Sequence, residues 1–181
     1  ENVSIADHAL QNYMIPGKMN ARPGYFDVNK TPYLREIMEC LHFSSNVQEV
    51  ALMKSAQIGG TSVTIAFLLW LMDTGHSAPT LVVFPTERTS QRFVKNKLRP
   101  AIRSCKSLQK TMKLATLNRE TLELIDSPAG PIGFGNSHAP NSMRMDSCRV
   151  VVFDEVSDYP GDTGQGDAVE IGRGRAITFE G

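Results

Sequence analysis

The stretch Lys54-Ser-Ala-Gln-Ile-Gly-Gly-Thr61 has the frame of a phosphate-binding loop whose lysine has moved. The usual loop reads G-x-x-x-x-G-K-[ST] and lies between a strand and a helix. Here a lysine takes the place of the first glycine, and Gly60 takes the place of the usual lysine. The apolar run Glu49–Met53 predicts a short buried strand before the loop, and Thr61–Asp73 predicts a buried helix after it. We therefore expect backbone N–H groups and a helix N-terminus to hold an anion, with Lys54 reaching across the loop. The alternative is an ordinary Gly-Gly turn.

A second stretch, Val150-Val-Val-Phe-Asp154-Glu155, predicts a central strand that ends in two carboxylates. In open parallel sheets, ligands bind at the carboxyl edge of the strands. Together with the loop, this pair predicts an ATP hydrolysis site. We expect Thr61 and Asp154 to hold Mg²⁺, the aspartate through water, and Glu155 to orient and activate the attacking water. The alternative is a strand that runs into an acidic turn.

The remaining pattern alternates strands with helices. It predicts a strand at 80–84, a helix from Glu87 to Cys105 interrupted at Arg99-Pro100, and antiparallel strands at 121–125 and 131–134. Residues 1–31 are polar and rich in turns, which predicts a loop and an extension. We expect an α/β fold of the P-loop NTPase class, with a mostly parallel sheet and helices on both faces, over residues 32–181.

Bulk composition excludes several classes of protein. The formal net charge is zero, so any attraction to nucleic acid must be local. Three scattered cysteines argue against a zinc site or a disulfide framework. The longest apolar stretch is about half of the roughly 20 residues that span a bilayer. Glu1 stands where an initiator methionine is usual, so we expect a fragment of a longer protein.

Basic residues recur at helical spacing after the second predicted strand. If the segment is one helix, they fall on a single stripe. A stripe of this kind suits contacts to a phosphate backbone, and the absence of interleaved aromatic residues favours duplex over single-stranded DNA. The alternative is a solvated helix face. The residues of this basic stripe are Arg88, Arg92, Lys95, Arg99, Arg103 and Lys106.

These residues together resemble a known family, the large terminase subunits of tailed bacteriophages, of the lambda type. The resemblance covers Pro32 to about Phe179, and a lysine displaced to the start of the loop is typical of that family. The matching stretches are Pro32-Tyr-Leu-Arg-Glu-Ile-Met38, the loop Lys54–Thr61, Pro85-Thr86 and Val152-Phe-Asp-Glu-Val-Ser-Asp-Tyr-Pro160.

The resemblance implies a motor domain that hydrolyses ATP with Mg²⁺ and pumps double-stranded DNA into a viral procapsid. The implied partners are the portal protein of the procapsid, a small terminase subunit and further copies of the chain in a ring. The isolated chain is expected to be a monomer that is located in the host cytoplasm and does not bind a membrane. The sequence stops before the coupling motif and the nuclease domain that such proteins carry, so nuclease activity is expected only in a C-terminal part.

The resemblance also implies site residues. Tyr25 and Tyr33 are candidates for holding the adenine, with a loop position and a cap on the core as the alternatives. Arg144 is a candidate arginine finger for a neighbouring subunit, with a solvated loop arginine as the alternative. Gln57 stands where the family often carries arginine, and either contacts phosphate or only shapes the loop. The expected nucleotide-binding loop comprises Lys54, Ser55, Ala56, Gln57, Ile58, Gly59, Gly60, Thr61 and Ser62.

Two other functions remain open at this point. One is a helicase-like P-loop ATPase that acts on another nucleic acid. The other is a catalytically inactive module that binds nucleotide or docks on a capsid. Retention of Thr61, Asp154 and Glu155 argues against an inactive module.

Overall fold

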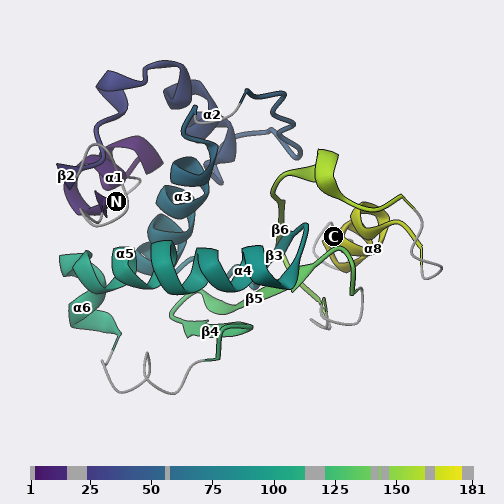
Figure 1. Cartoon of the computed structure of the whole chain (residues 1–181). Helices are drawn as coiled ribbons and strands as arrows, with labels where there is room; N and C mark the ends of the chain where they lie inside the picture. The colour runs from purple at the N-terminus through teal and green to yellow at the C-terminus, as the bar shows by residue number, and fades with distance from the viewer. Residues whose placement is uncertain are drawn as a thin grey trace.

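A small sheet with helices packed against it forms the centre of the structure, a computed structural model (Figure 1). It describes residues 3–15, 24–55, 58–112, 121–139, 143, 147–161 and 166–176. The helices are α1 (Ile5–Asn12), α2 (Tyr33–Leu41), α3 (Gly60–Thr74), α4 (Glu87–Phe93), α5 (Arg99–Ser104), α6 (Lys106–Thr111) and α8 (Ala168–Ala176), with 3-10 turns η1 (Val28–Lys30) and η4 (Val156–Asp158) and a π-helical turn η2 (Val94–Leu98). The strands are β1 (Met14–Ile15), β2 (Gly24–Tyr25), β3 (Thr80–Phe84), β4 (Leu124–Ser127), β5 (Gly130–Asn136) and β6 (Val150–Phe153).

The main sheet has the strand order β4-β5-β3-β6. Strand β3 runs parallel to both β5 and β6, so that Thr80 lies opposite Ile132 on one side and Val150 on the other. Strand β4 is antiparallel to β5, which confirms the predicted hairpin. The prediction that β6 is central is wrong for the described sheet, because β6 pairs there with β3 alone and lies at its edge.

Side chains of β3 alternate between the two faces of the sheet. Val82 and Phe84 belong to the large core that α3, α4 and α5 share. Leu81 and Val83 face the other side, where they pack in a smaller core with Ala168 of α8. The sheet is therefore covered by helices on both faces, as the sequence predicted.

Helix α3 is the buried axis of the large core. Glycines in the left-handed region flank it, Gly59 at φ 94° and Gly75 at φ 66°. Such a conformation costs glycine little, which explains why the helix begins and ends there. Between Val63 and Met72 nearly every side chain is buried, as predicted. Within the described ranges, no helix is long and apolar enough to cross a membrane.

The predicted strand at 49–53 does not form. These residues have no regular structure, most are exposed, and Met53 is fully exposed. A strand forms only where a neighbour pairs with its backbone groups, and residues 49–53 pair with none of the strands described. Apolar composition alone was therefore a misleading signal for this segment.

The helical run after β3 is not interrupted at Arg99-Pro100. Pro100 lies in the first turn of α5, where a missing N–H is tolerated. The irregularity falls earlier, at the π-helical turn η2. Val94 and Leu98, at the two ends of this turn, are completely buried and fix it against the core.

The N-terminal segment contains a helix where a loop was expected. Ile5, Ala6 and Ala9 of α1 are buried in the large core. The buried His8 pairs with Asp73 of α3 at 2.8 Å. Residues 5–12 therefore pack on the same core as α3, while the predicted domain boundary at residue 32 stays a prediction.

Candidate active site

The first turn of α3 forms one half of the candidate site. Gly59 turns the chain, and its carbonyl accepts hydrogen bonds from the N–H groups of Ser62 at 2.9 Å and Val63 at 3.1 Å. Thr61 and Ser62 are half-buried. The first turn of α3 carries no acidic residue, so the positive end of the helix dipole is not neutralised by its own side chains. This geometry suits an anion.

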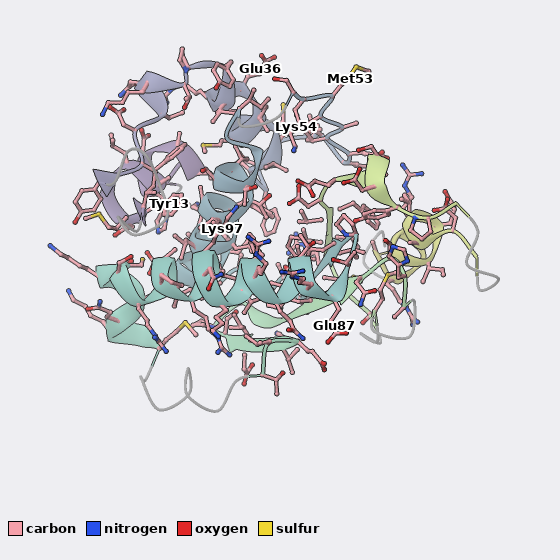
Figure 2. All side chains as sticks on the ribbon, viewed as in Figure 1. Tyr13, Glu36, Met53, Lys54, Glu87 and Lys97 are labelled. Atoms are coloured by element: carbon pink, nitrogen blue, oxygen red, sulfur yellow. The ribbon has the colours of Figure 1, made fainter. Side chains whose placement is uncertain are left out.

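Lys54 lies across the start of α3 (Figure 2). A Cβ built on Gly60 would stand 2.9 Å from both Cδ and Cε of Lys54 and 3.6 Å from its Nζ. The displaced lysine therefore brings its side chain to the position where the usual loop has its own lysine. Gly60 leaves room for that path.

The two candidate adenine-binding tyrosines lie in different settings. The hydroxyl of Tyr33 donates to the carbonyl of Ile58 at 3.1 Å, and the residue is 53% exposed. Tyr25 lies in β2 opposite Met14 and makes no hydrogen bond to the described residues of the loop. Tyr33 thus anchors the loop, whereas the structure does not bring Tyr25 into contact with it.

The second half of the site follows β6. The N–H of Asp154 still donates to the carbonyl of Val83 at 3.0 Å, so Asp154 continues the pairing of β6 with β3. Glu155 is exposed and has φ 53° and ψ 49°, the one positive φ outside glycine in the described ranges. A left-handed conformation costs a residue with a Cβ about 1–2 kcal/mol. Strain of this kind occurs preferentially at functional sites.

Tyr159 fixes the turn that carries the two carboxylates. Its hydroxyl donates to the carbonyl of Val83 at 2.8 Å, across from the end of β6. Burial, followed by the negative charge of Asp154, raises the pKa of this hydroxyl above its ordinary value. Tyr159 remains a hydrogen-bond donor at neutral pH. The sequence alone predicted no role for Tyr159, although this residue belongs to the stretch that resembles terminases.

One contact relates the two halves to each other. Arg173 of α8 pairs with Glu49, in the segment that leads to the loop, at 2.6 Å. Helix α8 packs on β6, so the segment before α3 and the end of β6 lie on the same side of the molecule (Figure 1). No hydrogen bond or ion pair in the described part of the chain joins Lys54 or Thr61 to either carboxylate.

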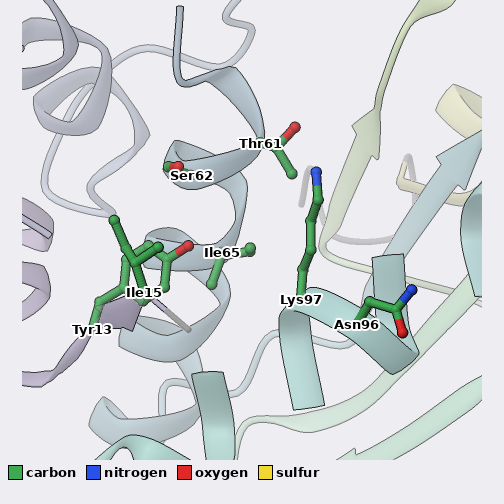
Figure 3. Close-up of a pocket in the computed structure, with 7 residues that line it drawn as sticks. All are labelled: Tyr13, Ile15, Thr61, Ser62, Ile65, Asn96 and Lys97. Carbon is green, nitrogen blue, oxygen red and sulfur yellow. The ribbon is translucent and has the colours of Figure 1, made fainter. Parts of the chain in front are cut away.

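A small cavity of about 50 Å³ adjoins the first turn of α3 (Figure 3). Tyr13 contributes to it and shares a hydrogen bond with Ser62. Burial raises the pKa of Tyr13 to about 12, and the bond to Ser62 offsets part of this shift. The sequence alone did not predict Tyr13, Asn96 and Lys97 as site residues, because only packing brings them to the loop. The residues that line the cavity are Tyr13, Ile15, Thr61, Ser62, Ile65, Asn96 and Lys97.

The basic stripe is exposed over most of its length. Arg88, Arg92, Lys95 and Arg103 are exposed on the helical run from α4 to α5. Arg99 is half-buried, and its guanidinium donates to the carbonyl of Thr121 at 3.1 Å. The stripe is therefore divided at Arg99, whose guanidinium is engaged by the backbone of Thr121.

Three candidate residues, Ala56, Gln57 and Arg144, lie outside the described residues. Across the described ranges, no group of three or more histidine, cysteine, aspartate or glutamate side chains could hold a metal ion. A magnesium site of the P-loop type does not use such a cluster, because it relies on one hydroxyl, one carboxylate, water and the nucleotide's phosphates.

The chain was also compared with known proteins. Residues 20–181 match the family model described as phage terminase large subunit gpA, ATPase domain. Searches of curated proteins and of solved structures gave no significant match. The ATPase domain of terminases has a P-loop fold, which agrees with the mostly parallel sheet and its helices. The chain belongs to the family of the phage terminase large subunit gpA, and the match spans the ATPase domain of that family.

Proposed function

We propose that this ATPase domain hydrolyses ATP to move double-stranded DNA into a viral procapsid. The observation that carries the proposal is the path of Lys54 over Gly60 at the start of α3. It places a cation at the positive end of a helix that has no acidic residue in its first turn. Such an arrangement is unfavourable by itself and becomes favourable when a polyphosphate lies between the charges.

The residues of the two halves then have separate roles. Lys54 and the backbone of the first turn of α3 bind the phosphates. The hydroxyl of Thr61 and the carboxylate of Asp154 are oxygen ligands of the kind that Mg²⁺ prefers. When bound, Mg²⁺ neutralises charge on the phosphates. The loop residues Ser55, Ala56, Gln57, Ile58, Gly59 and Ser62 complete the proposed phosphate contacts.

Glu155 is the proposed base. It accepts a proton from the attacking water and orients that water toward the terminal phosphate. Its left-handed backbone sets the direction of its side chain at the end of β6. Tyr33 and Tyr25 remain the proposed adenine contacts, and Tyr33 already anchors Ile58 of the loop.

The proposed DNA contact is the exposed part of the basic stripe, formed by Arg88, Arg92, Lys95 and Arg103. The zero net charge means that DNA is attracted locally rather than by the whole molecule. The proposed partners are the portal protein, a small terminase subunit and further copies of the chain in a ring. Arg144 is proposed to act as an arginine finger across the boundary between copies.

The test compares binding with turnover. Glu155→Gln should bind MgATP as the unchanged chain does but lose hydrolysis, because only the group that activates water is altered. Glu123→Gln, another exposed glutamate on a loop, is the matched control and should hydrolyse ATP normally. Normal hydrolysis by Glu155→Gln contradicts the assignment of the base. No hydrolysis by the unchanged chain at high concentration with DNA supports an inactive module instead.

A further inference from the structure

Lys97 lies beside the first turn of α3, although it comes from a different part of the chain. It belongs to η2 and lines the same small cavity as Thr61. Figure 3 shows its side chain extending toward Thr61, while the side chain of Asn96 points elsewhere. Lys97 is not part of the basic stripe, because residues two apart on a helix do not share a face. It therefore points away from its neighbour Lys95.

The π-helical turn explains this direction. A π-turn widens one turn of a helix and occurs frequently at functional sites. Val94 and Leu98 bracket the turn and are both 0% exposed, so the core holds its orientation. Lys97 is thus presented to α3 by a fixed element rather than by a loop.

The charges around Lys97 indicate an anion. Lys97 is exposed, and among the described residues it has no ion-pair partner. Its side chain extends toward Thr61 of the first turn of α3 (Figure 3), and Lys54 lies against Gly60 of the same turn. Two like charges at the positive end of a helix repel each other and the helix dipole. An anion between them converts this repulsion into attraction.

We infer that Lys97 is a second phosphate-binding lysine of the nucleotide site and contacts the terminal phosphate of ATP. The inference rests on the proposed function. In P-loop sites the threonine of the first turn lies beside the Mg²⁺ that bridges the β- and γ-phosphates. A side chain that extends toward Thr61 is therefore placed for the terminal end of the nucleotide. Lys97 distinguishes ATP from ADP, and it links the nucleotide to the helical run that carries the basic stripe.

The experiment measures the affinities of Lys97→Ala for fluorescent MgATP and MgADP analogues. We expect the ATP affinity to fall about tenfold to a hundredfold, as for a lost hydrogen bond to a charged group. The ADP affinity should fall less than about threefold, because the contacted phosphate is missing from ADP. Lys97→Arg keeps the charge and should restore most of the preference for ATP.

The control is Lys110→Ala, an exposed lysine on α6 outside the cavity, which should leave both affinities unchanged. Unchanged ATP affinity in Lys97→Ala, or equal losses for ATP and ADP, would overturn the inference while leaving the proposed function intact. If the unchanged chain binds neither nucleotide, the proposed function itself fails. Lys97→Gln retains most of the side-chain stem and repeats the test with less change in packing.

Discussion

Gly60 is the residue at which the helix and the displaced lysine meet. It occupies the position of the lysine in the usual loop, and the stem of Lys54 passes directly over it. Its role follows from the absence of a side chain, because a Cβ would lie 2.9 Å from two carbons of Lys54. The altered motif is therefore a paired change: the cation moves to the start of the loop, and a glycine opens the path for it.

The variant Gly60→Ala tests this pairing. Alanine favours a helix over glycine by about 1 kcal/mol, so the melting temperature should not fall. The Lys54 side chain must move, so the affinity for MgATP should fall about tenfold. Isothermal titration and thermal unfolding measure the two effects. Gly174→Ala in α8, where an added Cβ meets nothing within 4 Å, is the control. Unchanged affinity in Gly60→Ala would show that Lys54 need not follow this path.

Glu155 provides a second test at a single residue. Because its φ is 53°, glycine should be tolerated there better than alanine. Glu155→Gly should unfold at the same or a higher temperature than Glu155→Ala, with a difference of about 1 kcal/mol in the free energy of unfolding. Both variants should lose hydrolysis. Greater stability of the alanine variant would mean that the backbone is not strained at this position.

At the scale of elements, the helical run α4-η2-α5 presents the exposed basic residues. Arg92→Ala and Lys95→Ala should weaken binding to duplex DNA equally for different sequences, because phosphate contacts carry no sequence information. Each substitution should reduce the slope of log K against log salt concentration by about 0.9. Arg99→Ala should change the slope less, since the guanidinium of Arg99 already donates to the carbonyl of Thr121. Salt titrations of DNA binding measure these slopes. Unaltered slopes in all three variants would show that the basic stripe does not contact DNA and is only a solvated helix face.

The sequence predicted elements well where local pattern determines them. Helix α3 and strands β3 and β6 follow from long apolar runs, and the hairpin of β4 and β5 follows from the turn between them. The strand at 49–53 was predicted wrongly, because its formation depends on a partner that no local pattern reveals. The turn η2 was missed for a similar reason: its π-helical form depends on the burial of Val94 and Leu98 against the core.

The candidate site likewise contains some residues that local sequence predicts and others that it does not. The loop and the carboxylate pair carry motifs that can be read along the chain. Tyr13, Lys97 and Tyr159 reach the site through packing, by way of α1, η2 and the turn after β6. Helix α1 itself was missed because Asp7 and His8 interrupt its apolar pattern, although His8 is buried against Asp73.

At the scale of the whole molecule, one chain supplies only part of the proposed motor. Arginine fingers contribute on the order of 10³–10⁵ in rate when they act across a subunit boundary. We expect the isolated chain to be monomeric and therefore nearly inactive, because one chain cannot form a subunit boundary. ATP turnover should rise with protein concentration or on assembly at a portal. In mixed assemblies, Arg144→Ala copies should lower the activity of their neighbours while still binding ATP. Full activity of the chain at high dilution would rule out this role for Arg144.

The central claim is that the displaced Lys54 supplies the charge of a nucleotide site at the start of α3. The most direct measurement is equilibrium binding of a fluorescent ATP analogue, with and without Mg²⁺, to the unchanged chain, Lys54→Ala and the control Lys110→Ala. We predict Mg²⁺-dependent binding by the unchanged chain and by Lys110→Ala, and an affinity lower by about tenfold or more in Lys54→Ala. Equal affinities of Lys54→Ala and the unchanged chain would contradict the account.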